Sequence, residues 1–268
     1  FVASLRAQGI DLALQIYGGG RYSNPFIRRL GARLAVGLKA EDAEPLDRWI
    51  AYAPLQNRRL QLLEVVALAG ARQLRLEREL AVTARDRREA ALAVALPEDA
   101  PLVLLQPGAS DARRRWPAQH FARVADVLAS EGAAIAVHGT AAEADIVREV
   151  IGRMRHPALD LSGRLSLSAL CGLLECSALL VSNDTGPLHL ALAIGTPAVG
   201  IYWLTNLYES GPLLQDRHRA ALAVRTHCPV CDAENLRQRC AHDASFVADV
   251  SVEEVTALAR ELLLNRSR

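Results

Sequence analysis

The stretch from Ser177 to Trp203 constrains the fold more tightly than any other part of this chain, because turn residues divide it into three short apolar segments. Its first apolar run, residues 178–181, has no polar interruption, which is typical of a strand buried on both faces. The turn sequence S-N-D-T-G then ends the strand, and Pro187 suits the first turn of a helix because it has no N–H to leave unpaired. The helix is expected to stop at Gly195, and a second apolar strand follows at 198–202.

A helix that begins directly after the end of a strand predicts an anion site in this stretch. The free N–H groups of its first turn and the helix dipole both favour negative charge at that position. Since Pro187 has no N–H, the expected donors are the N–H groups of Gly186, Leu188 or His189.

The same alternation of strands and helices runs through the chain before this stretch. Apolar strands are expected at 102–106, 133–138 and 158–161, and amphipathic helices at 118–130, 142–154 and 166–176. Such alternation implies a parallel sheet covered on both faces, and these sheets bind ligands at the carboxyl ends of their strands. Three turns should therefore converge on one crevice, namely residues 107–117, 139–143 and 182–189.

These turns carry the groups that a nucleotide with a diphosphate requires. Ser110 offers a hydroxyl, the run Arg113 to Arg115 offers fixed positive charge, and Glu143 offers a carboxylate for ribose hydroxyls. Each group also has a structural interpretation. Arginines before a helix are commonly solvated, Glu143 can serve the dipole of its own helix, and His189 can be a core histidine. Their convergence in one crevice is what favours the binding site.

The chain before residue 97 carries a strand at 10–16, a glycine cluster after it, and helical patterns at 61–80 and 85–96. The loop after the glycines is polar and basic, so it faces either a phosphorylated acceptor or water; it includes Arg21 and Asn24. Neither a dinucleotide fingerprint nor a P-loop accompanies the glycines. The segment P-E-D-A-P at 97–101 predicts a stiff connector, and the domain boundary is placed there.

The composition is that of a folded globular protein, with 51% hydrophobic and 23% charged residues. The formal net charge of +1 gives no sign of a nucleic-acid partner. The apolar runs are shorter than the ~20 residues of a membrane-spanning helix, and no signal-peptide pattern opens the chain. Five cysteines are too few for a disulfide scaffold, so they are expected to be reduced in the cytoplasm.

Three segments resemble one known family. Residues 184–197, D-T-G-P-L-H-L-A-L-A-I-G-T-P, are similar to the D-[ST]-G-x-x-H-x-A-x-A-x-G-x-P signature of glycosyltransferase family 9, which contains the ADP-heptose:lipopolysaccharide heptosyltransferases. Residues 106–117, Q-P-G-A-S-D-A-R-R-R-W-P, resemble its P-G-A-S-x-x-K-x-W-P segment, and the G-T-A-A-E turn at 139–143 resembles its G-x-x-x-E. The resemblance implies an α/β fold of the GT-B type, with two Rossmann-like domains on parallel sheets, the N-terminal one incomplete.

The implied domain organisation has three parts. Residues 1–96 would be the remnant of an N-terminal acceptor-side domain, residues 97–250 the nucleotide-sugar donor domain, and residues 251–268 a helix packing back toward the N-terminal domain. The residues themselves also predict this last helix, because Ser251 and Glu254 form the pattern of a capping box before an apolar run.

Carried over to the matching positions, the resemblance implies donor-binding roles for seven residues. Ser110 and Arg114 would contact the diphosphate, Glu143 the ribose and Asp184 the transferred sugar, while the wall beside the phosphates would be Thr185, Gly186 and His189. Arg114 stands where many relatives have lysine, so the charge is kept but the reach differs. The acceptor side would lie near Arg21 and Asn24.

The implied reaction is an inverting transfer of a heptose or related sugar from an ADP-sugar to a lipopolysaccharide core acceptor, without a required metal or cofactor. The general base would be a carboxylate from a loop expected upstream of Phe1, and a chain without that loop would bind donor weakly and transfer little sugar. The implied location is the cytoplasm, with peripheral association at the inner face of the inner membrane. Two other functions stay open, namely a truncated, non-catalytic nucleotide-sugar binding module and a sugar-nucleotide epimerase.

A group of soft ligands lies near the end of the chain. Cys228, Cys231, Cys240 and His242 follow the pattern C-x2-C…C-x-H, which offers four ligands to a zinc ion. The eight residues between Cys231 and Cys240 are fewer than in a usual zinc finger. Reduced structural thiols are therefore the default interpretation, with zinc as the alternative.

Overall fold

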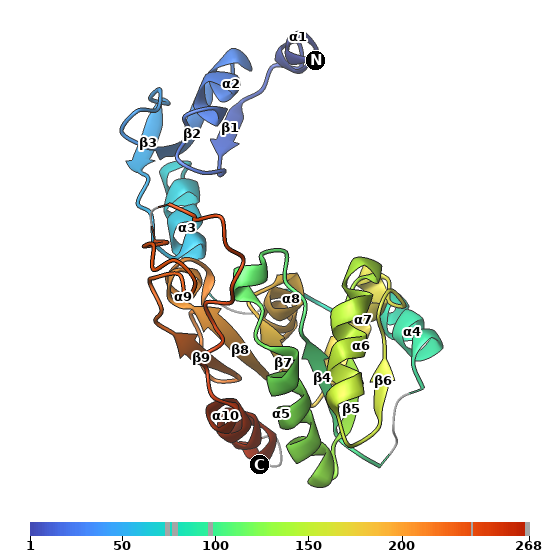
Figure 1. Ribbon diagram of the computed structural model, residues 1–268. Coiled ribbons are helices and arrows are strands. Elements are labelled where there is room, and N and C mark those ends of the chain that lie inside the picture. The colour runs from blue at the N-terminus through green and yellow to red at the C-terminus, as the bar shows by residue number, and fades with distance from the viewer. Residues whose placement is uncertain (73–75, 77–79, 96–98, 237, 266–268) are drawn as a thin grey trace. The chain divides into compact units, whose positions relative to one another are not determined.

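The computed structural model describes residues 1–268 except 73–75, 77–79, 96–98, 237 and 266–268, and the chain divides into two compact units (Figure 1). The first unit comprises Phe1–Leu76 with Tyr208–Ser210, and the second comprises Glu77–Leu207 with Gly211–Arg268. Among the described residues, no helix combines the length and the apolar character needed to cross a bilayer.

The first unit is built on a parallel sheet of three strands in the order β1-β2-β3. Its elements are α1 (Val2–Arg6), β1 (Leu12–Gln15), α2 (Ser23–Arg29), β2 (Leu34–Lys39), β3 (Arg48–Ala51) and α3 (Arg58–Leu68). The central strand β2 buries Val36 and Leu38 against Val65 of α3, and these three residues form the core of the unit. Strand β1 confirms the strand expected at 10–16.

Helix α3 is shorter than the helical pattern at 61–80 predicts. It begins after Asn57, whose side chain accepts a hydrogen bond of 3.1 Å from the N–H of Arg59, and it ends at Leu68. Gly70 follows with a φ of +106°, a conformation that ends helices and that glycine adopts without strain. Part of the remaining pattern, at 73–75 and 77–79, lies outside the described residues.

The second unit contains a parallel sheet of six strands in the order β6-β5-β4-β7-β8-β9. The strands are β4 (Leu102–Gln106), β5 (Ala134–Val137), β6 (Ala158–Asp160), β7 (Leu179–Asn183), β8 (Ala198–Trp203) and β9 (His218–Ala223). The first five confirm the predicted strands, and β9 adds an edge strand that the sequence pattern did not reveal. Because β4 lies between β5 and β7, the loops that follow these three strands are neighbours.

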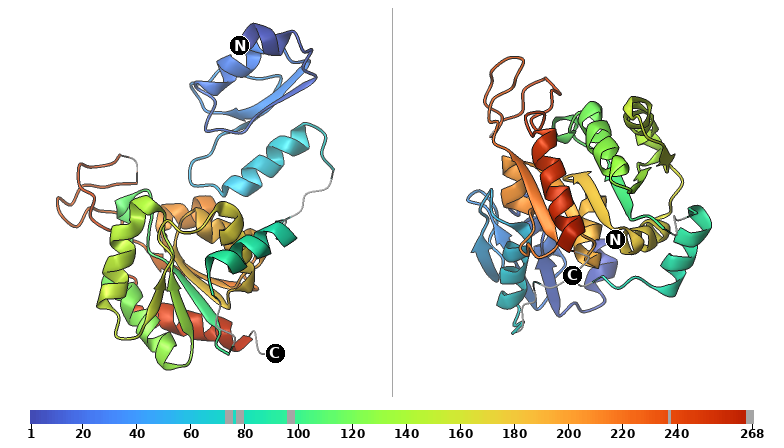
Figure 2. Two further views of the ribbon diagram at one scale, coloured as in Figure 1. Left: turned by 90° about the vertical axis from the view of Figure 1, so that its right-hand side faces the viewer. Right: turned by 90° about the horizontal axis from the view of Figure 1, so that it is seen from below.

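Helices cover both faces of this sheet, because alternate residues of each buried strand point to opposite sides (Figure 2). Val103 and Leu105 of β4 pack on the side of α5 (Ala118–Ser130), α6 (Ala144–Arg153) and α10 (Val252–Asn265). Leu102 and Leu104 pack on the side of α4 (Ala84–Ala93), α7 (Leu167–Cys176) and α8 (Gly186–Ile194). A strand that is buried on both faces explains the uninterrupted apolar runs of the sequence.

Helix α4 belongs to the second unit, although the sequence pattern assigned residues up to 96 to the N-terminal domain. It packs along α7 where Gly172 leaves room, since a Cβ at that position would lie 2.3 Å from the carbonyl oxygen of Asp86. Arg87 also pairs with Glu175 at 2.6 Å. The units therefore divide between residues 76 and 77, not between 96 and 97, and residues 97 and 98 of the expected connector lie outside the described residues.

The final helix, α10, packs on the sheet of the second unit. Val255, Ala259 and Leu262 are buried there, and the helix contacts α5, β7, β8 and β9. Ser251 Oγ accepts a hydrogen bond of 3.1 Å from the N–H of Glu254, as the predicted cap requires. The apolar face of the helix is thus used within the second unit, and its expected approach to the N-terminal domain stays a prediction.

Candidate functional site

The loops after β4, β5 and β7 meet at the carboxyl edge of the second sheet, as the parallel topology predicts. Asn183, the last residue of β7, joins two of them. Its buried side chain donates to the carbonyl oxygen of Pro107 at 2.8 Å and accepts a hydrogen bond of 3.0 Å from the N–H of Trp116. Trp116 is fully buried, and its Nε1 donates to the carbonyl oxygen of Val250 at 2.9 Å. The loop after β4 is thus held at both of its ends.

Asp184 lies at the centre of this edge, with a side chain that is 4% exposed. Arg114 Nη1 lies 3.3 Å from its Oδ2, and His189 Nε2 lies 3.1 Å from its Oδ1. Arg114 Nη2 also donates to Ser110 Oγ at 3.1 Å. Four of the residues predicted to bind a donor are therefore connected by contacts from Ser110 through Arg114 and Asp184 to His189. The basic side chains can hold an anion, and the carboxylate can accept hydrogen bonds from sugar hydroxyls.

The other two arginines of the run point elsewhere. Arg113, in the short helix η1 (Ala112–Arg114), pairs with Asp111 at 2.7 Å. The hydrogen bonds from Arg113 hold the pKa of the Asp111 carboxyl below its ordinary value. Arg115 donates from Nε to the carbonyl oxygen of Ala109 at 2.9 Å. Of the three arginines, only Arg114 reaches Asp184.

Glu143 lies over the start of the loop that follows β4. A Cβ on Gly108 would come within 2.0 Å of Glu143 Oε1, so glycine permits this close approach. The other carboxylate oxygen, Oε2, accepts hydrogen bonds of 2.9 Å from both the N–H and the hydroxyl of Thr140, at the start of η2 (Ala141–Glu143). Glu143 therefore caps its own helix with one oxygen and places the other at the crevice. Its contact with a ribose stays a prediction.

The N-terminus of α8 offers fewer donors than the sequence predicts. Gly186 is the first residue of the helix, and Thr185 precedes it as the cap. The N–H groups of Leu188 and His189 donate to the carbonyl oxygen of Thr185 at 3.1 and 3.3 Å, so they are already paired. Among the described residues the N–H of Gly186 has no acceptor. Apart from its chain neighbours and the backbone of its own helix, no atom lies within 4 Å of a Cβ built on it. Of the three N–H groups predicted to bind an anion, that of Gly186 is therefore the one available among the described residues.

Two buried titratable groups adjoin this cluster from β8 and β9. The hydroxyl of Tyr202 lies 3.4 Å from Nε2 of His218. Burial raises the pKa of Tyr202, and the negative charge of Asp184 raises it further. Burial lowers the pKa of His218 to about 4, and the charges of His189 and Arg219 act in the same direction. Tyr202 and His218 are therefore neutral at pH 7.

In the first unit, the two residues predicted for the acceptor side differ in position. Arg21 is exposed and lies 3.4 Å from Asp42 in an ion pair. Asn24 is fully buried, and its amide donates to the carbonyl oxygens of Leu38 at 3.0 Å and Glu44 at 2.8 Å. The prediction that Asn24 faces an acceptor is therefore corrected, because its amide is used to fix backbone inside the unit. Arg21 stays the acceptor-side prediction.

Asn183 and Trp116 contribute to the site although the sequence reasoning assigned them no role. The available signal for Asn183 was a polar residue at the end of an apolar strand, where a buried amide must find partners. The signal for Trp116 was weaker, since a tryptophan beside an arginine run is as consistent with an exposed position as with a buried one. The cysteine group, by contrast, lies together as the zinc alternative requires, with Cys228, Cys231, Cys240 and His242 close in space.

Solved structures of other proteins define the class of fold. A glycosyltransferase family 9 structure from Veillonella parvula matches 98% of this chain and 77% of its own, with a TM-score of 0.76 and 19% identity. The structure of E. coli ADP-heptose lps heptosyltransferase II matches 100% of this chain and 80% of its own, with a TM-score of 0.73 and 18% identity. The fold is thus the α/β, GT-B type that the sequence resemblance implies.

The family follows from the sequence match. The family model described as glycosyltransferase family 9 (heptosyltransferase) matches residues 1–241, and this chain belongs to that family. Lipooligosaccharide heptosyltransferase 2 of Haemophilus influenzae is 29% identical over 124 residues, which cover 44% of this chain and 36% of the relative. The protein of the same name from Haemophilus ducreyi is 31% identical over 123 residues, which cover 43% and 35%. These matches span about a third of each relative's length.

Proposed function

We propose that this chain binds an ADP-sugar at the carboxyl edge of its second sheet, as the donor side of an inverting heptosyltransferase of lipopolysaccharide core synthesis. The observation that carries the proposal is the grouping of Arg114, Asp184 and His189 at the N-terminus of α8, where the N–H of Gly186 has no acceptor among the described residues. Membership of family 9 and the names of the matched relatives support the reaction class, the donor and the acceptor. The cytoplasmic location and the peripheral membrane association stay predictions.

In the proposed complex the diphosphate lies between Arg114, Ser110 and the N–H of Gly186. Arg114 supplies charge-assisted hydrogen bonds, and Gly186 supplies a donor at the positive end of the helix dipole. The sugar lies against Asp184, whose carboxylate accepts hydrogen bonds from hydroxyl groups. The ribose lies against Glu143, through the oxygen that Thr140 does not use.

The proposed reaction is a single displacement at the anomeric carbon. The acceptor hydroxyl oxygen forms a bond to that carbon while the bond from the carbon to the diphosphate oxygen breaks, and ADP leaves with the electron pair. Negative charge grows on the leaving diphosphate, where Arg114 and the N-terminus of α8 stabilise it. The proton of the acceptor hydroxyl passes to a carboxylate base, a role that the geometry assigns to none of the described residues.

Calorimetric titration of the chain with ADP and with AMP tests the donor site. We expect ADP to bind more tightly, because Arg114 and Gly186 act on the second phosphate. Equal affinities for the two nucleotides would contradict the proposed placement of the diphosphate.

A transfer assay separates the transferase from the non-catalytic binding module. ADP-heptose and a core oligosaccharide are incubated with the chain and with a version extended at its N-terminus, and the product is measured by mass spectrometry. Transfer by either protein supports the transferase. Tight ADP binding without transfer by either protein supports the binding module.

A further inference from the structure

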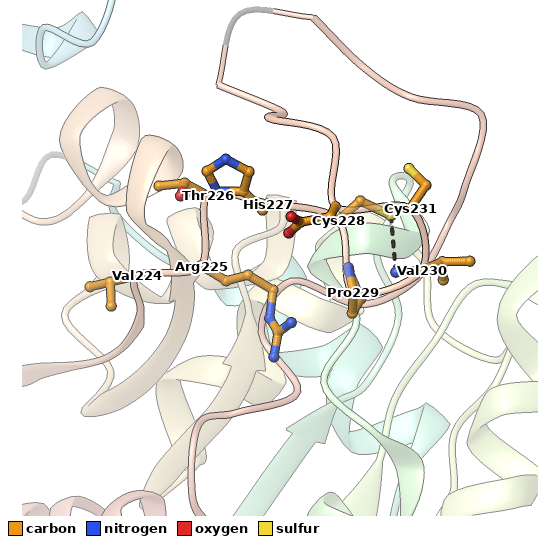
Figure 3. A pocket seen from close by; sticks show the side chains of 9 residues that line it. Val224, Arg225, Thr226, His227, Cys228, Pro229, Val230 and Cys231 are labelled. Carbon is orange, nitrogen blue, oxygen red and sulfur yellow. Dashed lines mark hydrogen bonds between the residues drawn. The ribbon is translucent and has the colours of Figure 1, made fainter.

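The loop between β9 and α10 holds three of the five cysteines of this chain. Its first part, residues 224–232, lines a pocket of about 540 Å³ (Figure 3). Cys228 is buried and packs with the core of the second unit, whereas Cys231 is exposed. None of the donor-site contacts described above uses these cysteines, so their grouping needs a separate explanation.

The ligand atoms of Cys228, Cys231, Cys240 and His242 all lie within 4.8 Å of one another. In a tetrahedral zinc site with Zn–S bonds of about 2.3 Å, neighbouring ligand atoms are about 3.8 Å apart. The four side chains therefore need to move inward by no more than about 1 Å per pair to reach that geometry. Four ligand atoms are grouped this closely although their residues lie up to 14 positions apart in the chain. Such a grouping is more than a chance contact between two thiols.

The backbone around Cys228 and Cys231 already forms a turn of the kind that holds metal ligands. Val230 N–H donates to Cys228 Sγ at 3.4 Å, which is the dashed line in Figure 3. The N–H of Cys228 donates to the carbonyl oxygen of Ala233 at 2.9 Å, and the N–H of Asp232 donates to the carbonyl oxygen of Cys228 at 2.9 Å. Asp232 has a φ of +56°, which reverses the chain directly after Cys231. An N–H aimed at sulfur stabilises a thiolate, the form that binds metal.

The imidazole of His242 has an unsatisfied atom in this cluster. Its Nδ1 is buried and has no hydrogen-bond partner among the described residues. A buried polar atom without a partner destabilises the fold, so such atoms are rare unless a ligand supplies the contact. Coordination of a metal through Nδ1 would satisfy the atom.

We propose that Cys228, Cys231, Cys240 and His242 bind one Zn²⁺ ion in a closed tetrahedral site. Three sulfur ligands and one imidazole favour Zn²⁺ over the hard ions Mg²⁺ and Ca²⁺, which prefer oxygen. Four protein ligands leave no position open for water, so the site is structural and takes no part in the transfer reaction. Thiol protons leave as the ion binds, and no oxidant or reductant is required.

The site also braces the loop that carries Arg114. Asn235, which lies between the second and third cysteines, accepts a hydrogen bond of 3.3 Å from the N–H of Cys240 and another of 3.3 Å from Arg113 Nη1. Further along, the N–H of Phe246 donates to the carbonyl oxygen of Arg113 at 2.8 Å. Zinc therefore fixes the residue next to Arg114, and this consequence rests on the proposed donor function.

Elemental analysis of the purified chain tests the metal site directly. We expect about one zinc per chain in the natural sequence and in the control Cys176→Ser, because Cys176 is exposed and lies outside the cluster. The double variant Cys231→Ser, Cys240→Ser should hold less than about a tenth of that amount, since it loses two of four ligands. Circular dichroism checks that the variants are folded.

Cobalt binding to the natural chain supplies a measurement that does not depend on a variant folding. Co²⁺ added to the reduced, metal-free chain should give the near-ultraviolet thiolate-to-metal absorption, and added Zn²⁺ should abolish it. A chain without zinc as purified that also gives no cobalt absorption would overturn the proposal, as would full zinc content in the folded double variant. Iron in place of zinc would overturn the choice of ion.

The bracing effect has its own measurement. Removal of zinc by a chelator should weaken ADP binding several-fold. Unchanged ADP affinity in a chain shown to bind and then lose zinc would overturn the bracing effect alone. Absence of ADP binding in the zinc-loaded chain would instead count against the proposed donor function.

Discussion

Arg114 Nη1 lies 3.3 Å from Asp184 Oδ2, although the two residues are 70 positions apart in the chain. The contact exists because β4 and β7 are adjacent and parallel, so the loop after one meets the loop after the other. An incoming diphosphate would share Arg114 with Asp184, and the attached sugar would offer hydroxyl groups to the carboxylate. The pair therefore holds each side chain in the position where the proposed donor needs it.

Arg114→Ala should weaken ADP binding about ten- to one-hundred-fold, since hydrogen bonds to charged groups contribute about 1.5–3 kcal/mol. AMP binding should change less, because the second phosphate is the proposed partner. The control is Arg123→Ala, which removes an exposed arginine paired with Glu253. Calorimetric titration measures both affinities. Unchanged ADP affinity in Arg114→Ala would place the diphosphate elsewhere.

Gly186→Ala separates ligand binding from stability. Apart from its chain neighbours and the backbone of its own helix, no atom lies within 4 Å of the added Cβ, so the unliganded fold should tolerate it. We expect an unchanged melting temperature and weaker ADP binding, because the methyl group occupies the space in which the diphosphate approaches the N–H. Gly152→Ala, in α6, is the matched control, since its added Cβ also meets nothing within 4 Å. Equal ADP affinity in the two variants would remove Gly186 from the proposed site.

Asn183→Ala should lower the free energy of unfolding by about 2–3 kcal/mol. The substitution leaves the N–H of Trp116 and the carbonyl oxygen of Pro107 without their partner in a buried place. Urea unfolding followed by tryptophan fluorescence measures the change. Asn265→Ala, at the exposed end of α10, should stay within about 0.5 kcal/mol of the natural chain. A similar small effect in Asn183→Ala would mean that the loop after β4 is held by other contacts.

His218 should make the fold less stable as the pH falls from about 6.5 to 4. Its pKa is about 4 in the folded protein and about 6.5 in an unfolded chain, so the unfolded state binds more protons in this window. The loss of stability reaches about 3 kcal/mol at pH 4, because each pKa unit corresponds to about 1.4 kcal/mol.

The variant His218→Gln isolates this contribution, since glutamine does not titrate. Urea unfolding at pH 7 and at pH 4 should show a smaller loss of stability in the variant than in the natural chain. His156→Gln serves as the control, because that imidazole pairs with Asp126 near the surface. If His218→Gln and the natural chain show the same pH dependence, His218 is already protonated in the folded protein well above pH 4 and does not cause the loss of stability.

Local patterns were sufficient to predict most of the second unit. The strands at 102–106 and 178–181 and the helix at 118–130 follow from apolar periods that a single segment carries. The meeting of three loops also followed, because parallel strands present their carboxyl ends at one edge. The limits of α3 were harder to predict, since its end depends on the left-handed Gly70, which also fits an interrupted helix.

The partner of Arg114 was decided by tertiary structure. Arg113 and Arg115 contact Asp111 and Ala109 of their own loop, whereas Arg114 contacts Asp184 on a distant segment. The buried position of Asn24 and the contacts of α10 could not be predicted from the sequence either, because they depend on segments distant in the chain.

The stretch from Ser177 to Trp203 shows this division most clearly. The sequence by itself determined that a strand ends at a turn and a helix begins there, since strand and helix periods and the turn residues are local properties. Tertiary structure alone decided that Asp184 meets Arg114, which lies 70 positions away in the chain. That contact depends on which strands are neighbours and on the space between their loops, and neither property can be derived from a single segment.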